Sequence, residues 1–163
     1  MMSAVIRAAT PADTHAIFAL AYELAEFEDL THAFVATENG LRDALFGARP
    51  SIEALVAENE GRIVGYALFF HNYSSFMGKR GLYLEDVYVQ PDQRGNGLGA
   101  ALLQRLAALA VERQCGRFEW TVLDWNQPAI SFYEKMGATV LPDWRVVRLT
   151  GDALEKLAAG AGA

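Results

Sequence analysis

Three glycines fall within five positions in the stretch R-G-N-G-L-G, which occupies residues 94–99. This stretch follows an apolar run, LYLEDVYV (82–89), and opens a leucine-rich run at 98–112. Glycine lets the backbone approach a ligand closely and adopt positive φ, and the first N–H groups of a helix have no partners within it. Such a turn, with Arg94 beside it, could bind a phosphate group at a helix N-terminus. A glycine-rich turn that only packs a helix on a sheet is the alternative.

The spacing of the glycines limits which phosphate ligand would fit. A P-loop requires Gly-Lys-Ser/Thr after four intervening residues, and no lysine or hydroxyl residue follows here. Gly95, Gly97 and Gly99 form G-x-G-x-G, and Leu102 stands where a dinucleotide fingerprint needs its third glycine. The sequence therefore argues against an ATP-hydrolysing P-loop and only weakly favours a Rossmann site.

Two acidic residues, Glu85 and Asp86, lie inside the apolar run before this turn. Adjacent side chains of a strand face opposite sides unless a bulge intervenes, so we expect at least one carboxylate to be partly buried. A carboxylate in such a place can accept a proton, and Glu85 is our candidate for that task. A strand carboxylate paired with an arginine is an equally good interpretation of the pattern.

The elements that must position these residues follow from hydrophobic spacing and from cap and turn residues. We predict strands at 5–8, 54–58, 63–71, 82–89, 118–123 and 144–149. We predict helices from Thr10 to about Phe27, from near Thr37 to Leu45, and at 98–109, 126–136 and 152–159. The residues at 72–81 are expected to form a loop, and 160–163 a frayed tail. No linker or repeat divides the chain, so the whole of 1–163 is expected to be one α/β domain around one sheet.

Two segments resemble motifs of the GNAT family of N-acetyltransferases. R-G-N-G-L-G matches the family's R/Q-x-x-G-x-G/A turn, and N-Q-P-A-I-S-F-Y-E-K-M-G-A (126–138) matches its Asn…Phe-Tyr-Glu-Lys…Gly segment. From about Val5 to Leu149 the chain resembles the diamine (spermidine/spermine-type) and thialysine acetyltransferase branch, including ELAEFE (23–28) and LYLEDVYV. The resemblance implies a mixed, mostly antiparallel central sheet flanked by helices.

The resemblance also implies acetyl-CoA as co-substrate, with its diphosphate held by the glycine turn, and no metal. The residues expected near the coenzyme are Val87, Tyr88, Val89, Arg94, Gly95, Asn96, Gly97, Leu98, Gly99, Ala100, Asn126 and Tyr133. A backbone N–H at about Val87 would polarise the thioester carbonyl, which is a role that needs no particular side chain. Asn126 is also expected to cap its helix.

The same family comparison assigns roles to individual side chains. Glu85 would lie near the acceptor amine, as a general base or as an anchor for the cation, and Tyr133 would donate a proton to the departing thiolate. The acceptor side is expected to include Phe27, Glu28, Glu85 and Asp143, with Phe27 standing where the branch commonly has tyrosine. Without the resemblance, the better interpretation of Tyr133 is a core aromatic on a helix that faces the sheet. For Glu26, Asp29 and Asp143, an ordinary solvated position is at least as good an interpretation.

Bulk composition limits the partners. The formal charge of −6 argues against a nucleic-acid face and suits a cationic small molecule. A single cysteine and the lack of a membrane-span run fit a cytoplasmic protein, and the family implies a homodimer. We therefore predict an acetyl-CoA-dependent enzyme that acetylates a primary amine of a diamine, polyamine or lysine-like amino acid. Acetylation of a protein lysine or N-terminus, a non-catalytic acetyl-CoA sensor and a nucleotide-binding protein remain alternatives.

Overall fold

The computed structural model describes residues 4–162. Internal contacts divide the chain into two compact units, one reaching to Thr121 and the other beginning at Val122. Each unit is described by itself.

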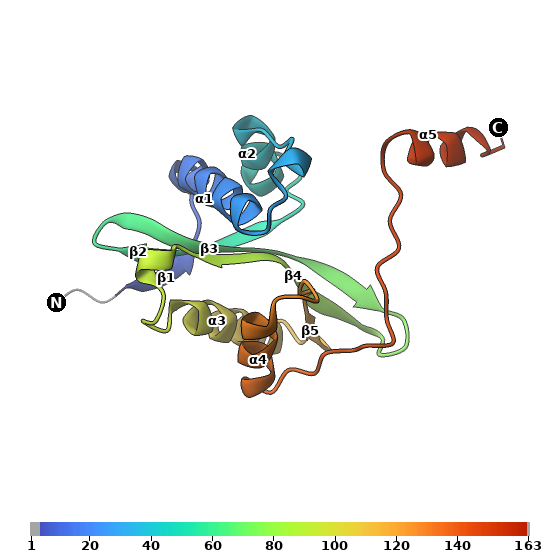
Figure 1. Cartoon of the computed structure of the whole chain (residues 1–163). Helices are drawn as coiled ribbons and strands as arrows, with labels where there is room; N and C mark the ends of the chain where they lie inside the picture. Colours follow the sequence, from blue (N-terminus) through green and yellow to red (C-terminus); the bar gives the residue numbers. More distant parts are fainter. Residues whose placement is uncertain (1–3, 163) are drawn as a thin grey trace. The chain divides into compact units, whose positions relative to one another are not determined.

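The first unit is built on a five-stranded sheet with helices on both faces (Figure 1). The strands are β1 (Val5–Ala8), β2 (Glu53–Asn59), β3 (Arg62–Ser74), β4 (Lys79–Val89) and β5 (Phe118–Glu119), in that spatial order. The first four are antiparallel to their neighbours, and β5 is parallel to β4. Helices α1 (Thr14–Phe27) and α2 (Glu38–Phe46) lie on one face, and α3 (Leu98–Glu112) lies on the other. The predicted mixed, mostly antiparallel fold is confirmed.

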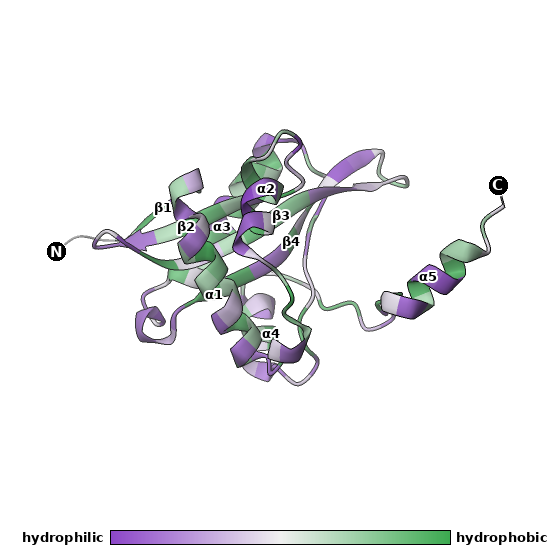
Figure 2. Cartoon of the chain, turned by 90° about the horizontal axis from the view of Figure 1, so that it is seen from above, coloured by the Kyte–Doolittle hydropathy of each residue, from purple (hydrophilic) through white to green (hydrophobic). Residues whose placement is uncertain are grey.

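The main core lies between α1, α2 and the sheet. Ile17 of α1 is fully buried and packs in one cluster with Val56 of β2 and Tyr66 of β3. On the opposite face, Leu102 and Leu106 of α3 are fully buried, as their helical spacing predicts. Each fully buried Ile or Leu side chain stabilises the fold by roughly 2 kcal/mol. Figure 2 shows the hydrophobic residues gathered along the sheet and on the helices that cover it.

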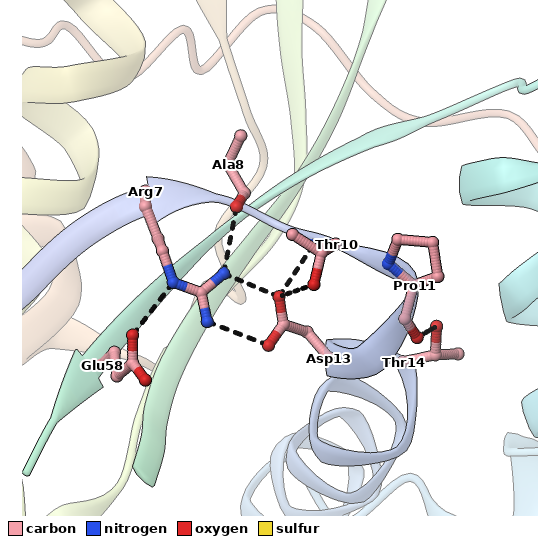
Figure 3. A network of polar contacts seen from close by, with 7 residues as sticks. All are labelled: Arg7, Ala8, Thr10, Pro11, Asp13, Thr14 and Glu58. Atoms are coloured by element: carbon pink, nitrogen blue, oxygen red, sulfur yellow. Dashed lines mark hydrogen bonds and ion pairs between the residues drawn. The ribbon is translucent and has the colours of Figure 1, made fainter. Parts of the chain in front are cut away.

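The start of α1 is tied to β1 and β2 by a network around Arg7 (Figure 3). Arg7 donates to both carboxylate oxygens of Asp13, at 2.7 and 3.0 Å, and to Glu58 Oε2 at 3.0 Å. The Thr10 N–H donates to Asp13 Oδ2 at 2.7 Å. Thr10 was expected to begin the helix, but a 3₁₀ turn, η1 (Pro11–Asp13), precedes α1. The buried Asp13 carboxylate stabilises this turn, because it accepts from both sides of it.

The hairpin between β3 and β4 is longer than its sequence predicts. The segment 72–81 was expected to be a loop, but Asn72 pairs with Gly81 and Ser74 pairs with Lys79. The loop was predicted from the polar and small side chains of this segment. That prediction was wrong because strand pairing is made by backbone hydrogen bonds, which form whatever the polarity of the side chains. Two further 3₁₀ turns, η2 (Thr31–Ala33) and η3 (Pro91–Gln93), lie in the connections of this unit.

The second unit contains α4 (Gln127–Lys135) and α5 (Gly151–Ala159), both close to their predicted positions. The predicted strand at 118–123 shrinks to the two residues of β5, and none forms at 144–149 within the described chain. Trp144, Val146 and Val147 are instead exposed, Val147 to 94%. A strand needs a partner edge for its backbone groups, and alternating apolar residues do not supply one. The predicted tail continues past α5 without regular structure, and residue 163 lies outside the described residues.

Candidate active site

A β-bulge in β4 separates the two adjacent carboxylates. Asp86 pairs with Leu68 of β3, whereas Leu84 pairs with Phe69, so Glu85 is the extra residue of the bulge. The Glu85 residue is exposed, and Asp86 is half-buried. The sequence predicted one partly buried carboxylate in this run, and the structure identifies it as Asp86.

Asp86 is held by the most deeply buried tyrosine of the described sheet. The Tyr66 side chain is 0% exposed, and its hydroxyl donates to Asp86 Oδ2 at 3.0 Å. Burial raises the pKa of Asp86 from 3.8 to about 6, although the hydrogen bond from Tyr66 acts in the opposite direction. The negative charges of Glu85 and Glu28 raise this pKa further. A carboxylate with such a pKa is well matched to proton transfer near neutral pH.

Glu28, at the C-terminal end of α1, belongs to the same electrostatic group. Burial raises the pKa of Glu28, and its charge also contributes to the raised pKa values of Asp86 and Tyr66. Tyr66 and Asp86 are brought together by the pairing of β3 with β4, and the packing of α1 on the sheet adds Glu28, the C-cap of that helix. Carboxylates within range of one another disfavour their own charged forms and favour a cation between them.

Beyond this cluster, one edge of β4 is open. The pairing of β4 with β5 ends at Tyr83 and Glu119, so in the described part of the sheet no strand covers β4 after that point. The N–H of Gln90 donates to the carbonyl of Val64 in β3 at 2.9 Å. Because alternate residues of an antiparallel strand direct their N–H groups to opposite sides, those of Val87 and Val89 point to the open edge. Two unpaired backbone donors thus follow the Asp86 carboxylate along the strand.

The same strand leads into the glycine turn. Gly95 and Gly97 have φ of 86° and 77°, which is the left-handed region that favours glycine. Gly97 is the N-cap of α3, which begins at Leu98. A Cβ atom placed on Gly95, Gly97 or Gly99 would meet no heavy atom of the described chain within 4 Å. Gly95 and Gly97 are therefore needed for backbone conformation, and the space above the turn is open to a ligand.

Arg94 lies beside this turn between two aromatic rings. Its guanidinium carbon is 5.4 Å from the ring centroid of Phe27 and 5.4 Å from that of Tyr88. Its Nε donates to the Val89 carbonyl at 2.8 Å. Phe27 was expected on the acceptor side, but the structure places its ring against the arginine of the expected coenzyme turn.

The remaining predicted site residues lie in the second unit. The Asn126 side chain accepts from the Ala129 N–H at 3.3 Å and caps α4, as expected. Tyr133 is half-buried on α4, and its ring lies 5.6 Å from that of Phe132. Asp143 is exposed in the segment between α4 and α5. Their assignment to the site stays a prediction.

A comparison with known protein families identifies the family of the chain. Residues 14–138, which include β4, the glycine turn and α4, match the Acetyltransferase (GNAT) family. The chain belongs to the GNAT acetyltransferase family. This family uses acetyl-CoA as the acetyl donor, and the enzyme is an N-acetyltransferase.

Individual relatives of the acetyltransferase align over almost its full length. L-ornithine N5-acetyltransferase NATA1 of Arabidopsis thaliana is 38% identical, over 93% of this chain and 86% of that protein. Thialysine N-epsilon-acetyltransferase of Mus musculus is also 38% identical, over 97% of this chain and 99% of that protein. Among solved structures, the integron cassette protein VCH_CASS6 of V. cholerae is 25% identical, with a TM-score of 0.81 over 97% of this chain and 99% of that one.

The turn of the acetyltransferase fits a diphosphate by its chemistry. It combines open space, positive-φ glycines, the first amide groups of α3 and the exposed cation of Arg94. Among residues 4–162, no cluster of three or more His, Cys, Asp or Glu side chains has an arrangement suited to a metal ion. None of the helices in this range reaches the length and apolarity of a membrane span.

Sequence reasoning missed two features of the candidate site, Asp86 as the carboxylate with the raised pKa and Tyr66 as its partner. The neighbouring Glu85 and Asp86 were recognised, but a bulge has no sequence signature that says which of two adjacent residues turns outward. Tyr66 lies in an apolar strand, where it reads as a core residue. Only the register between β3 and β4 brings its hydroxyl to Asp86.

Proposed function

We propose that this enzyme transfers the acetyl group of acetyl-CoA to a primary amine of a small cationic acceptor, such as a diamine, a polyamine or a lysine-like amino acid. The observation that carries the proposal is the order of groups along β4. A half-buried carboxylate at Asp86 is followed by outward-directed N–H groups at Val87 and Val89 and then by the glycine turn. The relatives named for ornithine and thialysine support an acceptor with an amine at the end of a chain.

The acceptor would be held by the acidic groups around the bulge. Glu28, Glu85 and Asp86 interact electrostatically, and two of them have raised pKa values. A second positive charge on the acceptor would favour the ionised forms of these carboxylates, which selects dications over simple amines. Asp143, which is exposed in the second unit, is proposed to extend this preference.

Asp86 is proposed to accept the proton of the amine. An alkyl ammonium has a reference pKa of about 10.4, so it must lose a proton before its nitrogen can attack a carbonyl carbon. A carboxylate with a pKa of about 6 is ionised at pH 7.5 and retains some basicity. Glu85, exposed on the bulge next to it, is proposed to anchor the ammonium form or to relay the proton through water.

The donor half of the site is proposed to consist of the open edge of β4, the glycine turn and α4. When bound, acetyl-CoA supplies the thioester carbonyl and a thiolate leaving group. The N–H of Val87 is aimed away from β3 and could stabilise an oxyanion. Residues 94–100 would hold the diphosphate, Asn126 would contact the coenzyme, and Tyr133 would protonate the thiolate, since a phenol with a reference pKa of about 10 is protonated at neutral pH.

We further propose that both units form one catalytic domain and that the enzyme is a cytoplasmic homodimer. The family match crosses the boundary between the units, which supports a single domain. The exposed apolar residues Trp144, Val146 and Val147 support a dimer, because a second copy of the chain could cover them. Light scattering of the purified protein over a concentration series would measure the oligomeric state directly.

A thiol-release assay tests the proposed function. Purified enzyme and acetyl-CoA are incubated with spermidine, putrescine, ornithine, lysine, thialysine or a histone-tail peptide. We expect release of CoA with at least one small dication at a kcat/KM at least 100 times that for the peptide. Preference for the peptide would indicate a protein acetyltransferase, and CoA binding without turnover of any amine would indicate a sensor.

A further inference from the structure

The exposed ring of Phe27 has a partner on the coenzyme side of the site. The Phe27 residue is 48% exposed, so burial in the core does not account for a phenylalanine at this position. Its ring lies 5.4 Å from the guanidinium carbon of Arg94, and the ring of Tyr88 lies at the same distance. An arginine flanked by two aromatic faces is attracted to both, and its side chain is restricted to the space between them.

Both rings are tied to the last two turns of α1. The Tyr88 hydroxyl donates to Glu23 Oε1 at 3.2 Å, and Gln90 Nε2 donates to Glu23 Oε2 at 3.1 Å. Glu23 and Phe27 are four residues apart on the helix, so they lie on the same face. The carboxylate of Glu23 therefore fixes one ring while Phe27 supplies the other. Within residues 4–162, the hydrogen bond of the guanidinium runs from Nε to the Val89 carbonyl, so both Nη groups remain for another acceptor.

We propose that Phe27 is a positioning residue for the coenzyme: together with Tyr88 it holds the Arg94 guanidinium ready to bind the diphosphate of CoA. The inference rests on the proposed function and adds a residue to its donor half. Phe27 acts through Arg94 and does not touch the reacting atoms. The next residue, Glu28, belongs to the acceptor group, so the end of α1 serves both halves of the site.

A double-mutant cycle on CoA affinity tests this role. Binding of CoA to the purified full-length protein is measured by titration calorimetry for the wild type, Phe27→Leu, Arg94→Ala and the double variant. A cation–π contact at an exposed site predicts that Phe27→Leu weakens CoA binding about two- to fivefold. The same substitution is expected to have no effect in the Arg94→Ala background, because the group that it positions is gone.

Three further variants separate positioning from a general structural role. Phe27→Tyr keeps the aromatic face and should retain wild-type affinity for CoA. Phe34→Leu is the matched control, because the Phe34 ring packs on Phe18 and Tyr22 of α1, whereas the rings recorded against Arg94 are those of Phe27 and Tyr88. Glu28→Gln should raise the KM for the amine while leaving the dissociation constant of CoA unchanged. Circular dichroism verifies that each variant is folded.

Several outcomes would overturn the proposal. It is wrong if Phe27→Leu binds CoA as tightly as the wild type, or if its loss persists in the Arg94→Ala background. It is also wrong if Phe34→Leu weakens binding equally. If the wild type itself shows no heat with CoA, the proposed function fails together with this inference. If the wild type binds CoA normally but the effects of Phe27→Leu and Arg94→Ala simply add, only the positioning role of Phe27 is wrong.

Discussion

Replacing Asp86 with asparagine should make the enzyme less active and more stable. The substitution keeps the shape of the side chain and an oxygen that can accept from the Tyr66 hydroxyl. It removes the negative charge, which the protein holds in a half-buried position beside Glu85 and Glu28. A residue whose role is only structural should not give this combination, since most substitutions of such residues lower stability.

The size of the stability effect follows from the pKa. In the folded protein the pKa of Asp86 is raised from 3.8 to about 6, mainly by burial, and one pH unit corresponds to about 1.4 kcal/mol. Ionised Asp86 therefore disfavours the folded state by at most about 3 kcal/mol at neutral pH. The folded state binds the proton more tightly than the unfolded state, so wild-type stability falls as pH rises from about 4 to about 6. Asp86→Asn should abolish this fall and unfold at higher denaturant concentration at pH 7.

The activity effect is measured on kcat/KM over a pH series. As a general base, Asp86 is expected to contribute a factor of about 100 or more, and the wild-type profile should rise with an apparent pKa near 6. Asp86→Asn should lower the plateau and eliminate this rise. Glu85→Gln keeps the proposed base but removes a neighbouring charge that raises the pKa of Asp86, so its profile should still rise, at a lower pH than in the wild type.

Two results would refute the assignment of Asp86. One is a profile for Asp86→Asn that still rises near pH 6 with undiminished activity, which would leave another group as the base. The other is a loss of stability at pH 7, which would mean that the ionised carboxylate is favourably paired in the fold and that its pKa is not raised.

Three other substitutions test separate parts of the structure. Tyr133→Phe should lower kcat about 10- to 100-fold without changing the dissociation constant of CoA. Steady-state kinetics and titration calorimetry measure the two quantities, and an unchanged kcat would mean that Tyr133 is only a packing residue. Gly97→Ala should lower the free energy of unfolding by about 1–2 kcal/mol, since its φ of 77° strains any residue with a Cβ. Gly99→Ala, inside α3, should not destabilise the protein. Equal effects of the two substitutions in urea denaturation would contradict this explanation. Asp13→Asn should lower the free energy of unfolding by about 2 kcal/mol at pH 7, because the Arg7 guanidinium holds the pKa of Asp13 below its usual value. This stabilisation is present above about pH 4 and is lost at lower pH. The unfolding free energies of the wild type and the variant should therefore converge in acid.

The glycine turn shows how far local sequence can predict a site. Positive φ at Gly95 and Gly97 and the start of α3 at Leu98 follow from residue types within a few positions of one another. The capping of α4 by Asn126 is equally local. Local features of this kind depend on short-range sterics and backbone hydrogen bonds, so the sequence predicts them well.

The strand at 144–149 shows where the same reasoning fails. Its aromatic and β-branched residues are typical of a strand, yet no strand forms there in the described chain. Strand structure depends on a neighbouring edge far away in the sequence, and the pattern carries no information about where that edge is.

By itself, the sequence determined the family, the order of most helices and strands, and the turn that could bind a diphosphate. Each of these depends on nearby residues or on motifs whose spacing is written along the chain. Only the tertiary structure decided that Asp86, rather than Glu85, is the buried carboxylate, and that Phe27 packs on Arg94. The first depends on a one-residue bulge between two strands, and the second on where the end of α1 meets the end of β4. Both are contacts between distant segments, and their geometry is set by packing that no local pattern encodes.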